Sequence, residues 1–396
     1  MSQTSCAVSD FYDRFPYPGD VLIDGPPPGY NWRWCFEAAY ASCSGTLFGS
    51  KHEQFTPKIL DAGCGTGVST DYLAHLNPGS EIFAIDISKN ALKIASKRLS
   101  RSKAFDIAKV SFEKTSLYDL PHINYFDFVN SVGVLHHLTD PSSGLKKLAS
   151  CMKPGGILHI FLYAEVGRRE IRSVQRSLTS LGLVPNDQGV RLGRKMLSEL
   201  PCCSQLRRNY EEKWSDECRA DVNFADMYLH PQEVNYNLDT LFQLIENTDL
   251  IFVGFSNPET WNIARLLKGE LLAIAKEMSL MKQWKLIEDL DLSISHFEFF
   301  LAKKPFPILD WVDDSSLLSA SGKISPCLWG WPTKDLLDRD MAPLKLSSES
   351  FEFLNVLHSS RPGTPLSELP LGWSSSQIAS TARDLLLRHV ILISPG

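Results

Sequence analysis

The chain has 396 residues, of which 43% are hydrophobic and 22% charged, and its formal net charge is −6. This composition is typical of globular proteins rather than disordered ones, and the length predicts about two or three domains. The negative charge argues against a dedicated nucleic-acid binder, so no nucleic-acid partner is expected. The chain begins without the basic and apolar regions of a secretory signal, and its longest apolar run is far too short for a membrane span. Its nine cysteines show no C-x-x-C spacing. We therefore expect a cytoplasmic protein with reduced thiols and no metal site.

Residues 1–54 are predicted to form an irregular N-terminal cap. Aromatic and turn-forming residues are frequent here, and the run Gly-Pro-Pro-Pro-Gly at 25–29 interrupts regular structure. One short helix is expected at 32–42. The aromatic residues Tyr12 and Tyr17 are candidates to cover a substrate, with core filling as the alternative.

From Lys58 onward, apolar strands alternate with helices. Strands are predicted at 58–62, 81–86, 110–113, 126–131 and 157–163, and helices at 69–76, after Ser88, and at 142–152. Ser88 is a suitable N-cap, because Leu92, Ala95 and Leu99 then share one helical face. Strands that alternate with helices over this length predict crossover connections and a parallel sheet.

A polar, partly helical insertion at 164–235 interrupts this alternation and is predicted to form a lid. A helix at 238–247, a strand at 250–255, a helical stretch at 261–287 and a closing strand at 294–302 follow. The predicted fold is therefore α/β, with a doubly wound, Rossmann-like sheet of seven strands in a domain spanning 55–304.

Residues 305–396 are predicted to form a separate C-terminal module. Helices at 350–357 and 376–388 and a strand at 390–394 suggest a small α+β unit that resembles a winged helix. The helix at 376–388 carries few basic residues, so dimerisation or partner docking is favoured over DNA reading.

The segment Ile-Leu-Asp-Ala-Gly-Cys-Gly-Thr-Gly at 59–67 joins an apolar strand to a glycine-rich turn and a helix. Such a turn lets the backbone approach a ligand beyond the carboxyl ends of the strands. Dinucleotide sites use G-x-G-x-x-G, whereas here the glycines alternate and Val68 takes the third position. Asp61 would repel a pyrophosphate but suits a cationic amino-acid group. The pattern therefore favours S-adenosylmethionine over NAD.

A second acidic residue, Asp86, ends the second predicted strand. A carboxylate at this position can accept hydrogen bonds from both hydroxyls of an adenosine ribose. The alternative is that it caps the following helix.

Together these motifs resemble the class I S-adenosylmethionine-dependent methyltransferases with L-D-x-G-C-G-T-G. The resemblance covers residues 58–163 and includes Asp86, N-S-V-G-V-L-H-H-L at 130–138 and K-P-G-G at 153–156. The combination in this order is specific. It implies a methyltransferase (a transferase) with S-adenosylmethionine as its cofactor. By resemblance, Asp61, Gly63 and Gly65 lie against the methionine moiety and Asp86 holds the ribose.

One position departs from the family pattern. Ser116 replaces the acidic residue that often reads the adenine amino group, so adenine is expected to contact Ser116 and the backbone of Leu117. The full set of predicted cofactor-binding residues is Asp61, Gly63, Cys64, Gly65, Gly67, Asp86, Ile87, Ser116, Leu117 and Ser131.

Methyl transfer depends mainly on alignment, and a general base is needed only when the acceptor must lose a proton. Histidine titrates near neutrality. The candidates are His136 and His137, which follow the fourth strand, and His230, where the insertion returns to the sheet. A structural role in the turns is the alternative for each of them.

Nine Arg or Lys and three Asp or Glu occur at 168–208. Arg168 and Arg169 are therefore candidates to attract an anionic acceptor, with a solvated helical face as the alternative. The predicted function is methyl transfer to a small-molecule acceptor. A protein methyltransferase and a non-catalytic S-adenosylmethionine-binding regulator are the alternatives, and a homodimer is compatible with the C-terminal module.

Overall fold

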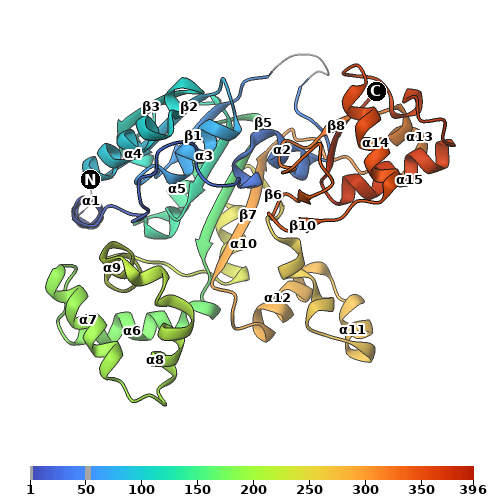
Figure 1. The fold of residues 1–396 in the computed structure, drawn as a ribbon. Coiled ribbons are helices and arrows are strands. Elements are labelled where there is room, and N and C mark those ends of the chain that lie inside the picture. Colours follow the sequence, from blue (N-terminus) through green and yellow to red (C-terminus); the bar gives the residue numbers. More distant parts are fainter. Residues whose placement is uncertain (1–2, 50–54) are drawn as a thin grey trace.

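The computed structural model describes residues 3–49 and 55–396, and a seven-stranded sheet lies at its centre (Figure 1). Its strands lie in the order β3-β2-β1-β4-β5-β7-β6. Their bounds are β1 Lys58–Ala62, β2 Glu81–Asp86, β3 Lys109–Lys114, β4 Phe126–Val132, β5 Met152–Tyr163, β6 Leu250–Phe255 and β7 His296–Lys303. The first five strands pair in parallel, and β7 runs antiparallel to both β5 and β6. The predicted doubly wound sheet is confirmed, and the strand order reverses between β1 and β4, where such sheets bind ligands.

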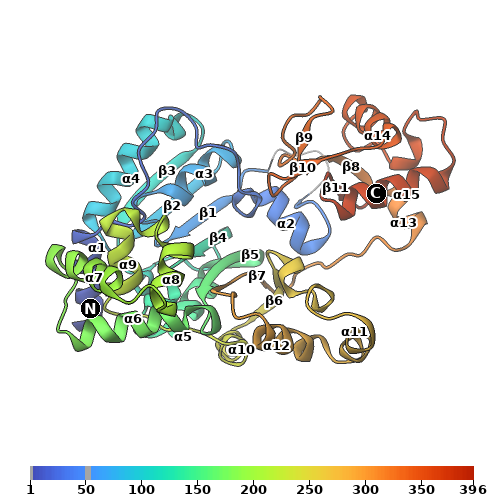
Figure 2. The same cartoon turned by 60° about the horizontal axis from the view of Figure 1, so that its bottom comes forward.

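Helices cover both faces of the sheet. On one face lie α5 (Pro141–Cys151), α10 (Leu238–Glu246) and α12 (Leu280–Leu290), whose apolar residues share a core with the central strands. On the other face lie α2 (Phe36–Ser44), α3 (Val68–Leu76) and α4 (Lys89–Ser102), which enclose a second core. Figure 2 shows the two helical layers on opposite sides of the strands. The short helix α11 (Gly269–Lys276) precedes α12.

The N-terminal segment is more regular than predicted. A 12-residue helix, α1 (Gln3–Arg14), precedes the 3-10 helix η1 (Trp32–Trp34) and α2. Val8, Phe11 and Phe15 follow the spacing of one helical face, and all three are at most 6% exposed. Phe11 and Phe15 share an apolar cluster with the insertion after β5. Residues 15–31 contain no helix or strand, in agreement with the predicted irregular segment. Helix α1 was not predicted, because the residues that pack against it are remote in sequence.

The insertion after β5 contains α6 (Arg169–Ser180), α7 (Asp187–Glu199), α8 (Gln205–Asn209) and α9 (Asp221–Leu229). We call these four helices the lid. They form a separate lobe in Figure 1 and pack against α1 around buried residues such as Phe224 and Leu197.

The C-terminal residues fold around their own apolar cluster. Their elements are α13 (Asp314–Ser319), β8 (Ser321–Ile324), β9 (Leu336–Leu337), β10 (Pro343–Leu344), α14 (Ser348–Ser359), α15 (Ser375–Leu387) and β11 (Ile391–Ser394). β8 pairs antiparallel with β11, and Lys323 of β8 forms an ion pair with Glu37 of α2. The winged-helix resemblance stays a prediction. Within the described chain, every helix is too short or too polar to cross a membrane.

Candidate active site

A cavity of about 270 Å³ lies at the carboxyl ends of β1, β2 and β4. Seven predicted cofactor-binding residues line it: Gly63, Cys64, Gly65, Asp86, Ile87, Ser116 and Leu117. Tyr12, Tyr17 and His137 line the same cavity, as does Trp34, which the sequence did not single out. The cavity therefore brings the glycine turn and the end of β2 together with the N-terminal segment.

Asp86 is held in place at the cavity wall by backbone groups. Gly65 N donates to its Oδ2 at 2.9 Å, and Ser88 N donates to its Oδ1 at 2.8 Å. Burial raises the pKa of Asp86 to about 6, although these N–H groups stabilise its ionised form. Ser88 is the N-cap of α4 through its own side chain, as predicted, so Asp86 remains directed at the cavity rather than capping the helix. Each of its oxygens keeps a lone pair for a ribose hydroxyl.

Asp61 lies behind the cavity wall. It is 1% exposed and accepts hydrogen bonds from Ser69 Oγ (2.8 Å), Thr70 Oγ1 (2.6 Å) and Asn130 Nδ2 (2.8 Å). These bonds tie the end of β1 to α3 and β4. Asp61 does not line the cavity, so its predicted contact with the methionine moiety stays a prediction.

Gly67 and Ser131 also lie outside the cavity lining. Gly67 has φ +82°, and a Cβ there would approach Cβ of Ala95 to 2.7 Å, so this glycine allows α3 to pack on α4. Ser131 is fully buried, and its hydroxyl has no hydrogen-bond partner among the described residues. Gly67 and Ser131, which were predicted to contact the cofactor, therefore do not line the cavity in this structure.

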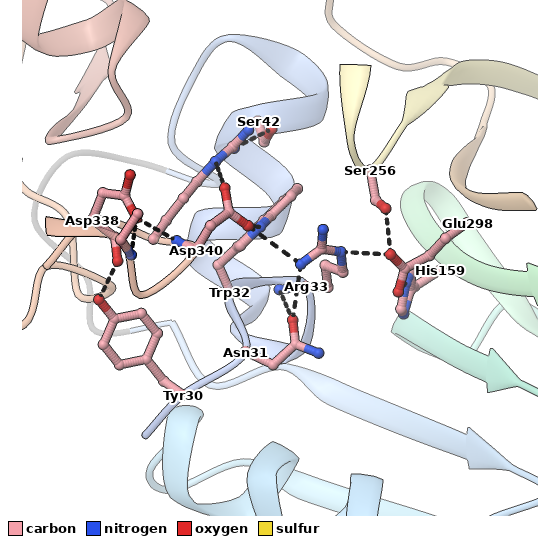
Figure 3. A network of polar contacts seen from close by, with 12 residues as sticks. Tyr30, Asn31, Trp32, Arg33, Ser42, His159, Ser256, Glu298, Asp338 and Asp340 are labelled. Atoms are coloured by element: carbon pink, nitrogen blue, oxygen red, sulfur yellow. Dashed lines mark hydrogen bonds and ion pairs between the residues drawn. The ribbon is translucent and has the colours of Figure 1, made fainter. Parts of the chain in front are cut away.

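Trp34, which lines the cavity, belongs to a polar network that crosses the sheet. Figure 3 shows the part of this network that contains His159, Glu298 and Arg33. The indole N–H of Trp34 donates to Asn130 Oδ1 at 3.0 Å, and Nδ1 of His159 lies 2.9 Å from the same oxygen. Nε2 of His159 lies 3.2 Å from Glu298, which forms an ion pair with Arg33 at 2.8 Å. The network therefore fixes the wall at Trp34 to β4, β5 and β7.

His137 is the one of the three predicted histidines that lines the cavity. Its Nδ1 lies 2.7 Å from the carbonyl oxygen of Gln232 and donates to it, which leaves Nε2 as an acceptor. Burial lowers the pKa of His137 to about 4, so the ring is neutral at pH 7.

The other two histidines lie behind His137. The ring of His230 is 3.8 Å from that of His137, and its Nδ1 accepts a hydrogen bond from Gln232 N at 3.1 Å. His136 is fully buried against Tyr163, at 3.9 Å between ring centroids, and neither of its ring nitrogens has a partner among the described residues. Neither His136 nor His230 lines the cavity, whereas direct catalysis needs a side chain that reaches the reactants.

Arg168 does not present its charge to solvent. Its guanidinium forms an ion pair with Glu233 at 2.9 Å, and the two side chains are 3% and 1% exposed. The same guanidinium lies over the Tyr163 ring, 3.4 Å from its centroid. The prediction that Arg168 attracts an anionic acceptor is therefore corrected, because Glu233 neutralises its charge. Arg169 is exposed at the start of α6.

Asp226 of α9 is a buried carboxylate next to the cavity that was not predicted from the sequence. It is 3% exposed and accepts a hydrogen bond from Tyr12 Oη at 3.0 Å. Asp226 lies four residues before His230, which directly follows α9, and ligating atoms of these two side chains lie within 4.8 Å of each other.

The parallel sheet, the glycine turn at its switch point and the carboxylate that ends β2 define a nucleotide-binding methyltransferase site. The chain belongs to the class I S-adenosylmethionine-dependent methyltransferase family. It is an enzyme of that family, with S-adenosylmethionine as its cofactor.

Comparisons with known proteins agree with this assignment. Residues 60–158 match the family model described as a methyltransferase domain. An uncharacterized protein of Synechococcus sp. is 46% identical over 397 residues, which cover 98% of this chain and 93% of that protein. A ubiquinone biosynthesis O-methyltransferase of Thiobacillus denitrificans is 38% identical over 100 residues, or 25% of this chain and 41% of that enzyme. The structure of PKMT2 from Rickettsia typhi in complex with AdoHcy has a similar fold, with a TM-score of 0.62 and 16% identity, over 93% of this chain and 77% of that one.

Proposed function

We propose that this enzyme transfers the methyl group of S-adenosylmethionine to a small molecule. The observation that carries this proposal is the closure of the cavity by the N-terminal segment. Thr66 N donates to the carbonyl oxygen of Tyr17 at 3.0 Å, and Thr66 Oγ1 donates to that of Pro18 at 2.7 Å. The backbone at Tyr17 and Pro18 therefore lies against the glycine turn, and the side chains of Tyr12 and Tyr17 line the cavity.

The size of the cavity supports the same proposal. Small-ligand sites commonly enclose about 300–1,000 Å³, and this cavity of about 270 Å³ lies near the lower limit. The cavity would also hold the cofactor, so the space left for the acceptor is small, and a compact acceptor fits it better than an extended polypeptide. The relative in Thiobacillus denitrificans, a ubiquinone biosynthesis O-methyltransferase, supports methylation of an oxygen atom, over the 25% of this chain that it matches.

In this proposal the chain's residues bind and orient the reactants. Asp86 would hold the ribose, the backbone from Gly63 to Gly65 would lie along the methionine moiety, and Ser116 and Leu117 would contact adenine. When bound, S-adenosylmethionine supplies an electrophilic methyl group on a sulfonium. Tyr12 and His137 would lie beside the methyl acceptor, and the N-terminal segment would exclude water.

The test is methyl transfer from labelled cofactor into an extract of the cells that produce the protein, separated into small-molecule and protein fractions. Label is expected in the small-molecule fraction, and Asp86→Ala should abolish it at limiting cofactor. Label confined to the protein fraction would overturn the proposal.

A further inference from the structure

Asp226 is a buried carboxylate connected to the cavity through one side chain. Tyr12 lines the cavity, and its hydroxyl donates to Asp226 Oδ1 at 3.0 Å, whereas Asp226 lies outside the lining. Because Tyr12 uses its proton in this bond, the lone pairs of its oxygen are free to accept a proton from a molecule in the cavity. The two residues come from α1 and α9, so the pair exists only when the lid and the N-terminal helix meet.

The charged surroundings leave Asp226 without a cation of its own. The titratable groups that face the pair are Tyr17, His137, Tyr163, Arg168, Glu217, His230 and Glu233. Among these described residues Arg168 is the permanent cation, and Glu233 is its ion-pair partner. Burial raises the pKa of Asp226 to about 7, and the hydrogen bond from Tyr12 opposes this rise. Asp226 can therefore gain or lose a proton near neutral pH.

A metal ion is the competing use of this cluster. One ligating atom each from His137, Asp226 and His230 lie within 4.8 Å of one another. However, Nδ1 of His230 accepts the N–H of Gln232, so in the neutral ring Nε2 carries the proton. That Nε2 is buried and has no hydrogen-bond partner among the described residues. Metal binding at Nε2 would need the proton on Nδ1, where it would face the N–H of Gln232. The tautomer of His230 therefore argues against metal binding at its Nε2.

We propose that Tyr12 and Asp226 form the proton-accepting pair of the reaction and that the acceptor presents a hydroxyl group. This inference rests on the proposed small-molecule function. As the acceptor oxygen bonds to the methyl carbon and the methyl–sulfur bond breaks, the hydroxyl proton moves to Tyr12 Oη. The phenolic proton of Tyr12 moves to Asp226 in the same step. Tyr12 is thus the catalytic residue, Asp226 is a positioning residue that acts through it, and the products are the methyl ether, neutral S-adenosylhomocysteine and protonated Asp226.

The first test compares Asp226→Asn and Tyr12→Phe with the control Asp221→Asn. Asp221 lies on the same helix, but its side chain is 71% exposed in a surface pair with Arg194. General base catalysis contributes roughly 10²–10⁴-fold, so label transfer into the small-molecule fraction should fall about 100-fold or more in both pair variants. The control should match the wild type. Cofactor affinity measured by calorimetry should stay within about twofold in all three, because ligand binding and proton transfer use different residues.

The pH profile separates proton transfer from a structural role. The wild-type rate should rise with a midpoint near 7, the pKa that burial gives Asp226, because the pair accepts a proton only when Asp226 is ionised. This limb should be absent in Asp226→Asn. Wild-type rates and an unchanged profile in that variant would overturn the proposal.

Two readouts do not depend on the acceptor. Infrared spectra of the wild type should show a carboxyl band that titrates near neutral pH and is missing in Asp226→Asn, and its absence from the wild type would contradict the inference. Stoichiometric metal in the purified wild type that is lost in Asp226→Asn would also overturn it, in favour of a metal site. If label enters protein alone and both pair variants lose it, the small-molecule proposal fails while the proton-accepting pair stands.

Discussion

At the scale of single residues, Asp86 and Asp226 are two buried carboxylates with different partners. Asp86 is held by two backbone N–H groups at the cavity wall, whereas Asp226 depends on the hydroxyl of Tyr12. The position of Asp86 could be predicted because a strand end and a capped helix lie beside it in sequence. The role proposed for Asp226 could not be predicted from the sequence, because its partner Tyr12 is 214 residues away.

Replacement of Asp86 by alanine should weaken S-adenosylmethionine binding at least about tenfold. The variant loses charge-assisted hydrogen bonds to the ribose, each contributing about 1.5–3 kcal/mol. Calorimetry measures the change, and Asp106→Ala at an exposed position of the same domain is the control. NAD should not bind the wild type. An unchanged affinity in Asp86→Ala would remove this residue from the site.

Replacement of Asp226 by asparagine should stabilise the fold while it reduces activity. Burial raises the pKa of Asp226 from 3.8 to about 7, so the folded chain binds more protons than the unfolded chain between these values. Asp226 therefore lowers the free energy of unfolding progressively as the pH rises from about 4 to above 7, by at most about 4 kcal/mol. The side-chain oxygen of asparagine can still accept the hydrogen bond from Tyr12, but asparagine carries no charge. Melting curves should show a higher melting temperature for the variant at pH 8 and little difference at pH 4; the opposite trend would exclude a buried, destabilising carboxylate.

At the scale of elements, local patterns predicted the sheet well and the lid poorly. β1, β2 and β6 have the predicted bounds, because each is a short apolar run beside turn residues. α1 was missed, since the partners of Phe11 and Phe15 lie in the lid. The buried state of Arg168 was missed for the same reason, because Glu233 follows 65 residues later.

The buried ion pair between Arg168 and Glu233 predicts different effects for substitutions at Arg168 and at its neighbour Arg169. Arg168→Ala should destabilise the protein by about 3–5 kcal/mol, because it leaves the buried carboxylate of Glu233 without its partner. Arg169→Ala, one residue later and exposed, should have almost no effect. Thermal melting of both variants checks this. Equal melting temperatures would mean that Glu233 is solvated or protonated when Arg168 is removed.

At the scale of the whole molecule, the C-terminal residues contact the N-terminal segment rather than standing apart. Trp32 Nε1 donates to Asp340 at 3.0 Å, Leu47 N donates to the Ile393 carbonyl at 2.9 Å, and Cys327 shares an apolar cluster with Cys35. The domain boundary near Pro305 stays a proposal. These contacts argue against C-terminal residues that fold independently of the rest of the chain.

A chain that ends at Pro305 keeps all seven strands of the central sheet and should therefore fold and bind S-adenosylmethionine. Its affinity should be lower, because Trp34 at the cavity wall directly follows residues that lose their C-terminal partners. Asp340→Ala, which removes the hydrogen bond from Trp32 and the ion pairs with Arg33 and Arg339 but keeps the other C-terminal contacts, should give a smaller loss. Calorimetry and melting curves of the two variants test this, and an insoluble truncated chain would show that the boundary is misplaced.

The contact of the N-terminal segment with the glycine turn has a kinetic consequence. While Tyr17 and Pro18 accept hydrogen bonds from Thr66, the segment covers the turn on which the cofactor rests. In the proposed function, exchange of spent for fresh cofactor would involve the opening of these bonds and of the packing of α1 on the lid. The rate of that motion would then set an upper limit on turnover, however rapid the methyl transfer itself.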